Sequence, residues 1–180
     1  MGMIQRNSDW ESRTAVKKGN VGEEIVRAFL ESKGFVVYKP ATDAAHPFDM
    51  LAVKDKRLCI AAEVKTKAMR THYRDTGFNK STYYDYVEFS QKHNMDIYVF
   101  FVDEHKSEIY GNWLKKLEQP RDVKMENGKV VHYPRDEKSK EGRWLRFYPY
   151  EAMQHVAWID GDTSAKLKRL SNRNYKYGGK

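Results

Sequence analysis

The chain has 180 residues, of which 33 are Lys or Arg and 25 are Asp or Glu, so its formal net charge is +8. With 40% hydrophobic residues it can bury one core, and its length favours one domain over two. A lone cysteine, Cys59, excludes a disulfide framework and a cysteine-based zinc site. No apolar run reaches the roughly eighteen residues of a membrane span, and the polar N-terminus has no signal-peptide core. We therefore expect a soluble, cytoplasmic protein that has no membrane partner.

The charge and the aromatic content together favour a nucleic-acid partner. The sequence has 12 Tyr and 4 Trp interleaved with basic residues, a composition typical of surfaces that stack bases and neutralise phosphates. Neither observation is specific, because Tyr and Trp also fill small cores and many soluble proteins are basic.

The first half of the chain predicts a helix followed by three strands. Apolar residues recur at three- and four-residue spacings over residues 20–33, and Gly34 supplies a helix stop. The run at residues 35–38 predicts a short strand. Two apolar runs, 48–53 and 58–64, flank a charged turn and predict a largely buried antiparallel hairpin.

The elements that follow complete a sheet flanked by helices. We expect a polar and basic loop over residues 66–80, a helix over 81–94 and a strand over 97–102, with a further strand or strand-to-helix passage at 108–114. The order of helix, strand, hairpin, helix and strand predicts an α/β or α+β fold.

Beyond Pro120 the pattern is looser. The dipeptide Asn127-Gly128 predicts a hairpin over residues 123–133. The other expected elements are a charged loop at 135–142, an exposed strand at 144–148, a short helix at 150–158 and a mobile basic tail at 163–180.

The predicted hairpin brings two carboxylates together. Asp49 begins one strand and Glu63 ends the other, so the two residues lie at the same open end of the hairpin. Because side chains alternate along a strand, Glu63 and Lys65 share a face while Val64 points into the core. The sequence therefore predicts Asp, Glu and Lys gathered at one edge of the sheet.

This set of residues suits a magnesium ion. Carboxylates at the ends of apolar strands are costly to desolvate unless a cation or hydrogen-bond donors compensate them. Mg²⁺ typically binds one or two carboxylates together with phosphate oxygens, and Lys65 is placed to position an attacking water or to stabilise developing charge. Hydrolysis of a phosphodiester follows as the natural chemistry. On the Glu-x-Lys triplet alone, an ordinary strand-end ion pair with Asp49 as a turn residue is the better interpretation.

The arrangement resembles the PD-(D/E)xK nuclease superfamily, which has the restriction-endonuclease-like fold. The motif is carried by Pro47-Phe48-Asp49 and Glu63-Val64-Lys65, with one residue inserted between the Pro and the Asp. The segment from Gly19 to Glu24, followed by Lys33-Gly34-Phe35, is similar to the first helix of archaeal-type Holliday junction resolvases and related phage nucleases. This resemblance spans roughly residues 18–102, a little under half of the chain.

The resemblance implies a fold, an activity and a cofactor. It implies a central mixed sheet in αβββαβ order and a DNA endonuclease that uses Mg²⁺, with Mn²⁺ as a substitute. The metal ligands would be Asp49, Glu63 and the backbone carbonyl of Val64. Glu23 would complete the acidic cluster, with Glu24 as the alternative. A favourable interaction of these carboxylates with the helix dipole is the other explanation. Such a protein would act in the nucleoid or in a phage-infected cell.

The resemblance also sets the expected boundaries and assembly. We expect a polar arm at residues 1–17, a nuclease-like domain at 18–160 and a basic tail at 161–180. Within the domain, the core would cover 18–114 and a C-terminal elaboration 121–160. Family members that cut both strands commonly dimerise, and the aromatic stretch 144–148 is a candidate interface for a homodimer.

DNA contacts are expected close to the motif. The segment that follows Lys65 is basic and aromatic, a composition suited to tracking a DNA backbone, although a solvated loop has the same composition. The candidate DNA-binding residues are Thr66, Lys67, Arg70, Tyr73, Arg74 and Lys80.

Two other functions remain open at this point. One is a non-catalytic nucleic-acid-binding module on the same fold, which gains little from carboxylates placed beside phosphates because like charges repel. The other is an unrelated basic interaction protein in which the triplet is a coincidence. A central mixed sheet would argue against the second.

Overall fold

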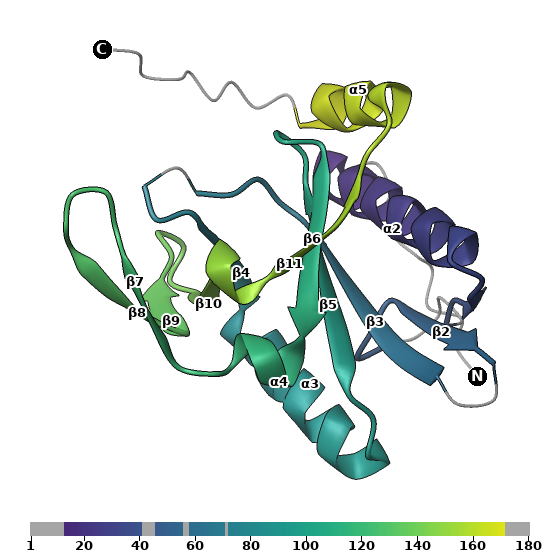
Figure 1. Ribbon diagram of the computed structural model, residues 1–180, viewed down its shortest axis with the longest axis horizontal. Coiled ribbons are helices and arrows are strands. Elements are labelled where there is room, and N and C mark those ends of the chain that lie inside the picture. The colour runs from purple at the N-terminus through teal and green to yellow at the C-terminus, as the bar shows by residue number, and fades with distance from the viewer. Residues whose placement is uncertain (1–12, 41–45, 56–57, 71, 172–180) are drawn as a thin grey trace, which may run out of the picture.

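A six-stranded mixed sheet forms the centre of the protein (Figure 1). The computed structural model describes residues 13–40, 46–55, 58–70 and 72–171. The central strands β3 and β5 are parallel, and the other neighbours are antiparallel. In spatial order the strands are β1 (Val36–Tyr38), β2 (Met50–Lys54), β3 (Leu58–Thr66), β5 (Ile97–Asp103), β6 (Glu108–Trp113) and β11 (Gln154–Trp158). The predicted fold class, a mixed sheet flanked by helices, is confirmed.

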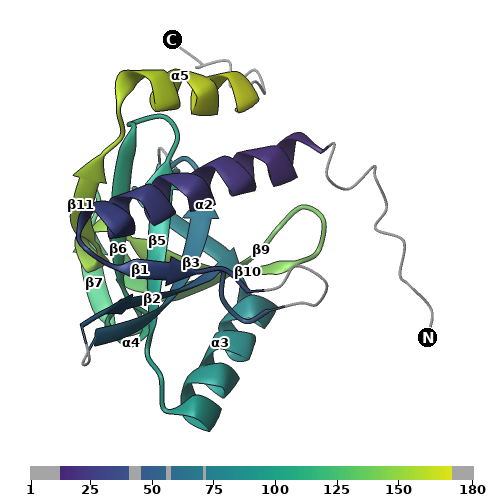
Figure 2. The same cartoon turned by 90° about the vertical axis from the view of Figure 1, so that its right-hand side faces the viewer.

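Two buried clusters cover the two faces of this sheet. On one face, α2 (Thr14–Ser32) and α5 (Gly161–Leu170) pack on the sheet through Val26, Leu30 and Leu167, as Figure 2 shows for the helices. On the other face lie α3 (Lys80–His93) and the short α4 (Leu114–Leu117), whose buried side chains contact alternate residues of β3 and β5. Because successive strand side chains point to opposite faces, the apolar runs of β3 and β5 serve both clusters.

A second sheet and a hairpin form the C-terminal part of the fold. The three-stranded sheet has the order β4 (Asp75–Asn79), β10 (Trp144–Pro149) and β9 (Arg135–Lys138). The hairpin of β7 (Arg121–Lys124) and β8 (Val130–Tyr133) confirms the prediction made from Asn127-Gly128. A 3₁₀ turn, η1 (Tyr150–Ala152), then leads into β11.

The predicted loop at 66–80 is wrong in part, because it contains β4. This strand has low intrinsic strand propensity, and its partners stabilise it instead. Asp75 is fully buried, and its carboxylate accepts hydrogen bonds from the Arg70 guanidinium and, at 2.8 Å, from the Tyr133 hydroxyl. The β10 backbone approaches Gly77 closely, because a Cβ at this position would lie 2.0 Å from the Arg146 carbonyl oxygen. Tyr133 lies 58 residues from Asp75, and the β10 backbone is more distant still in the sequence, so local patterns do not reveal these partners.

Three further predictions in the C-terminal part need correction. Residues 135–138 form β9 rather than a loop, and residues 150–158 form η1 and β11 rather than a helix. The predicted exposed strand at 144–148 is the central strand of its sheet, with Phe147 and Tyr148 buried. In each case a sheet edge supplied by another segment determines the structure.

Both predicted terminal segments contain helix. Helix α2 begins at Thr14, within the expected arm, and α5 occupies residues 161–170 of the expected tail. The side chain of Asp160 accepts a hydrogen bond from the Thr163 amide at 2.9 Å, a normal N-cap. Residues 1–12 of the arm and 172–180 of the tail lie outside the described residues.

Helix α2 approaches β3 closely at Gly22. A Cβ at this position would lie 1.8 Å from Thr66 Oγ1, whereas a Cβ at Gly19, in the same helix, would meet nothing within 4 Å. We expect Gly22→Ala to lower the free energy of unfolding by about 1–3 kcal/mol through overpacking. Gly19→Ala should raise it by about 0.5–1 kcal/mol, because Ala favours the helix.

Urea unfolding of the two variants measures both changes. The double variant Gly22→Ala, Thr66→Ala should recover part of the loss, since it removes the side chain that blocks the new methyl group. Equal effects of the two single Gly→Ala substitutions would contradict the close approach.

Candidate active site

Asp49 and Glu63 meet where β2 begins and β3 ends. The Asp49 amide donates to the Ala62 carbonyl at 3.0 Å, which extends the β2–β3 pairing by one step beyond the Met50–Ala62 pair. The carboxylate of Asp49 then accepts a hydrogen bond from the Val64 amide at 2.7 Å. Because the N–H and C=O of one strand residue point to the same edge, the Val64 carbonyl also faces this side of β3.

Glu63 and Lys65 share one face of β3, as the alternation predicts. Their side chains are paired by a hydrogen bond, and Glu63 is only 5% exposed. The Lys65 ammonium lies 5.8 and 5.9 Å from the ring centres of Phe78 and Tyr86. Val64 points to the opposite face, into the cluster formed with α2. The buried rings hold the lysine beside the carboxylates.

Burial makes both carboxylates harder to ionise. Desolvation raises the pKa of Glu63 to about 7, with the attraction of Lys65 opposing the shift and repulsion from Asp49 adding to it. Desolvation also raises the pKa of Asp49, although the Val64 amide and Lys65 act in the opposite direction. A cation placed between the two groups would remove this cost.

The helix carboxylates differ in their surroundings. Burial and repulsion from Asp49 raise the pKa of Glu23, whereas a hydrogen bond from Lys39 lowers that of Glu24. The Lys39 ammonium lies 2.6 Å from Glu24 Oε1 and 3.4 Å from Glu23 Oε2. Of the two helix carboxylates, Glu23 is the one whose pKa responds to the charge of Asp49. Over the described residues, no three His, Cys, Asp or Glu side chains form a group that could hold a metal ion, so Glu23 as a ligand stays a prediction.

The motif gave no indication of two residues at this site. Lys39 follows β1, and its charge acts on both Glu23 and Asp49. Tyr86, on α3, is 2% exposed, and burial, together with the negative charge of Glu63, raises the pKa of its hydroxyl. This hydroxyl makes no hydrogen bond of standard geometry among the described residues. A lysine after a strand and an aromatic residue in a helix are too common to indicate a site from sequence.

Two of the six predicted DNA-binding residues are held by acidic partners. Arg70 donates to both carboxylate oxygens of Asp75 at 2.6 and 2.7 Å and to Glu137 at 2.9 Å. Its guanidinium also lies 3.5 Å from the centre of the Phe147 ring. Lys80 is paired with Asp136 at 2.7 Å. These contacts anchor the second sheet.

The other four predicted DNA-binding residues differ in accessibility. Thr66 is turned towards Gly22, with its hydroxyl buried. Tyr73 is half-buried, with the Arg135 guanidinium 4.1 Å from its ring centre. Arg74 is exposed. Lys67 donates to the Gly77 carbonyl at 2.8 Å, and desolvation of its ammonium, together with repulsion from Lys65, Lys18 and Arg143, lowers its pKa to about 8. Lys67 and the cations around it remain candidates for phosphate contact.

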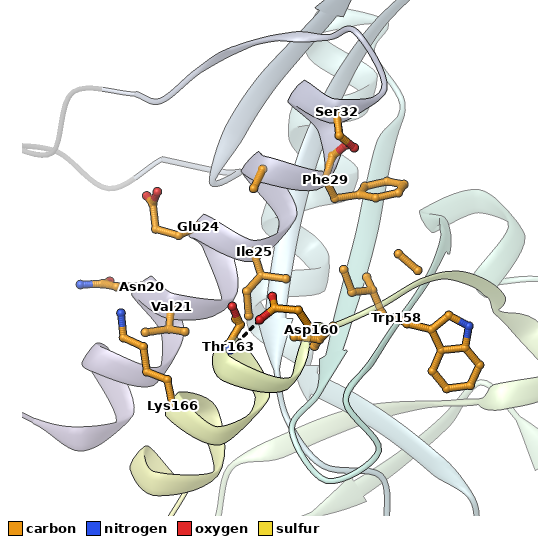
Figure 3. A pocket seen from close by; sticks show the side chains of 14 residues that line it. Asn20, Val21, Glu24, Ile25, Phe29, Ser32, Trp158, Asp160, Thr163 and Lys166 are labelled. Carbon is orange, nitrogen blue, oxygen red and sulfur yellow. Dashed lines mark hydrogen bonds between the residues drawn. The ribbon is translucent and has the colours of Figure 1, made fainter.

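A groove on the described surface lies away from Asp49 and Glu63. This groove of about 590 Å³ runs between α2, β11 and α5 (Figure 3). Its floor is apolar, with Ile25 and Phe29 on one side and Trp158 on the other. The acidic side chains in its lining are already engaged, since Asp160 caps α5 and Glu24 pairs with Arg27 and Lys39. The groove offers no evident catalytic group.

No helix within the described residues is long and apolar enough to span a bilayer. No protein-family model matches the chain, and no curated protein matches it.

Among solved structures, the chain is similar to Hjc, a Holliday junction resolvase from the hyperthermophilic archaeon Archaeoglobus fulgidus. The two chains are 14% identical, with a TM-score of 0.51 over 82% of this chain and 96% of that one. A nuclease from a fusselovirus aligns over 94% of this chain and 98% of its own, with 10% identity and a TM-score of 0.40. The likeness to the archaeal resolvase confirms the predicted restriction-endonuclease-like fold with its central mixed sheet.

Proposed function

We propose that the protein is a metal-dependent deoxyribonuclease, an endonuclease that hydrolyses phosphodiester bonds in junction or otherwise branched DNA. The observation that carries this proposal is the convergence of Asp49 and Glu63, two desolvated carboxylates, beside Lys65. The fold supports it, since the archaeal protein that shares this fold is a Holliday junction resolvase.

The residues present fit a magnesium ion. Asp49 and Glu63 supply two carboxylates, and the Val64 carbonyl faces the same side. Mg²⁺ usually takes few protein ligands and keeps waters or phosphate oxygens in its other positions, so a pair of carboxylates suffices. When bound, the ion supplies a Lewis acid that polarises the phosphodiester and lowers the pKa of a bound water.

The chain's own residues would hold and orient the reactants. Asp49 and Glu63 bind the cation, and the Val64 amide fixes the Asp49 carboxylate. Lys65 is paired with Glu63 and would orient the attacking water or offset the charge that develops on the phosphate. Lys67 and Arg143, whose charges act on each other, are placed to contact neighbouring phosphates of the DNA backbone.

Cleavage of a panel of labelled DNAs tests this proposal. The panel contains a four-way junction, a flap, a nicked duplex, a linear duplex and a single strand, each incubated with Mg²⁺, Mn²⁺ or EDTA. We expect cutting of the branched DNAs with either metal and none in EDTA, and Lys65→Ala should lose the activity. If the wild-type protein binds these DNAs and cuts none of them, it is a non-catalytic binding module on the same fold.

A further inference from the structure

Two exposed aromatic side chains face the same hollow on the second sheet. Trp144, at the start of β10, and Tyr84, on α3, line a shallow depression of about 480 Å³ together with Lys80 and Asp136. We call these four residues the aromatic cleft. Trp144 is 53% exposed and Tyr84 is 56% exposed, although they come from elements 60 residues apart in the sequence. Large aromatic surface left in water at one place indicates a binding site.

Lys80 brings a cation close to the Tyr84 ring. Its ammonium lies 5.9 Å from the centre of that ring and is bound to Asp136. Asp136 in turn accepts from Arg146 at 2.9 Å, and Arg146 also pairs with Glu118 at 2.6 Å, so two cations face two carboxylates. A positive residue in the first turn of a helix is unfavourable for the helix dipole, so the position of Lys80 does not serve the stability of α3.

The cleft adjoins the cations near the candidate active site. Arg143 directly precedes Trp144 at the start of β10, and β10 pairs with β4, whose Gly77 carbonyl accepts a hydrogen bond from Lys67 at 2.8 Å. The β9–β10 connection, which carries Arg143, also contains Lys140, and Lys138 ends β9. A DNA strand that contacts Lys67 and Arg143 would therefore bring its next nucleotides to the aromatic cleft.

We propose that the aromatic cleft binds an unpaired nucleobase, which stacks on Trp144 and Tyr84 while its phosphate lies near Lys80. This inference rests on the proposed function and names its substrate class, namely DNA in which at least one nucleotide next to the cleaved bond is unpaired. A continuous duplex keeps its bases stacked on one another and cannot offer one to the cleft. Stacking is tolerant of sequence, so the preference is for structure.

Binding of DNA in EDTA tests the inference without cleavage. The probes are a single-stranded oligonucleotide containing 2-aminopurine and a duplex of the same sequence. We expect Trp144→Ala and Tyr84→Ala each to weaken single-strand binding by about 5- to 150-fold, the loss for one stacked base, and to leave duplex affinity unchanged. Wild-type protein should quench the 2-aminopurine, and Trp144→Phe should retain most of the affinity.

Trp158→Ala is the matched control. Trp158 is 72% exposed and lines the groove between α2, β11 and α5 instead of the aromatic cleft. The inference is wrong if Trp144→Ala and Trp158→Ala weaken single-strand binding equally, or if neither does. It is also wrong if Trp144→Ala turns a dimer into a monomer in sedimentation and leaves DNA affinity unchanged, because the surface would then join two copies of the chain.

The same experiment separates this inference from the proposed function. Metal-dependent cutting of DNA together with a Trp144→Ala variant that binds normally would overturn the aromatic cleft alone. Selective loss of single-strand binding in a protein that cuts no DNA would support the cleft and overturn the nuclease activity. A wild-type protein that binds neither probe would overturn both.

Discussion

Asp49→Asn and Glu63→Gln should each reduce DNA cleavage by about a thousandfold or more while leaving the fold intact. Losing a metal-binding carboxylate removes several kcal/mol of transition-state stabilisation, and ~4 kcal/mol corresponds to a factor of about a thousand. Both amides match the replaced side chains in size. Single-turnover cleavage of the best substrate in the DNA panel measures the loss.

The helix glutamates provide a graded comparison and a control for this prediction. Glu23 acts on Asp49, so Glu23→Gln should lower cleavage by less than the loss of either strand carboxylate. Glu24 lines the groove between α2, β11 and α5 and pairs with Arg27 and Lys39, so Glu24→Gln should cut DNA at close to the wild-type rate. Equal rates for the Glu24→Gln and Glu63→Gln variants would contradict the assignment of the site.

Stability without metal should fall as the pH rises from about 4.5 to 7. The pKa of Glu63 is about 7 in the fold against an ordinary value of 4.5, so the folded state holds a proton that the unfolded chain has lost. The stabilisation that protonated Glu63 gives the folded state is fully present below pH 4.5 and is lost as the pH rises through 7. A shift of this size corresponds to about 3 kcal/mol. Asp49, whose pKa is also raised, changes stability in the same direction.

Urea unfolding in EDTA at a series of pH values measures this slope. Glu63→Gln should flatten it between pH 5 and 7, since its amide does not titrate. Glu31→Gln, an exposed position near the end of α2, should keep the wild-type slope. Saturating Mg²⁺ should stabilise the wild-type protein most at pH 8, where the carboxylates bind the ion without releasing a proton. The same slope in the wild-type and Glu63→Gln proteins would show that Glu63 ionises normally.

The hairpin and its carboxylates could be predicted because short-range patterns determine them. Strand alternation places Glu63 and Lys65 on one face, and the register follows from the two apolar runs on either side of the turn. The pairing of Met50 with Ala62 and the bond from Val64 to Asp49 agree with that reasoning. Residues 56 and 57 of the turn lie outside the described part of the chain.

The second sheet could not be predicted because its strands depend on distant partners. Asp75 and Gly77 are residue types typical of loops. Their contacts with Arg70, Tyr133 and the β10 backbone stabilise the strand instead. The same contacts pair the Arg70 guanidinium with Asp75 and Glu137, which a sequence cannot show, and its contact with DNA stays a prediction. Helix α5 is different, because Asp160 was a readable N-cap signal that the basic composition of the tail obscured.

Binding of Mn²⁺ tests most directly whether Asp49 and Glu63 form a metal site. In a titration followed by electron paramagnetic resonance, Mn²⁺ that binds to the protein no longer contributes to the signal of the free ion. The measurement therefore needs neither DNA nor cleavage. At pH 8 the wild-type protein and Glu31→Gln should bind the ion, and Asp49→Asn and Glu63→Gln should lose that binding. Equal binding by all four proteins, or none by the wild type, would contradict a metal centre at these carboxylates.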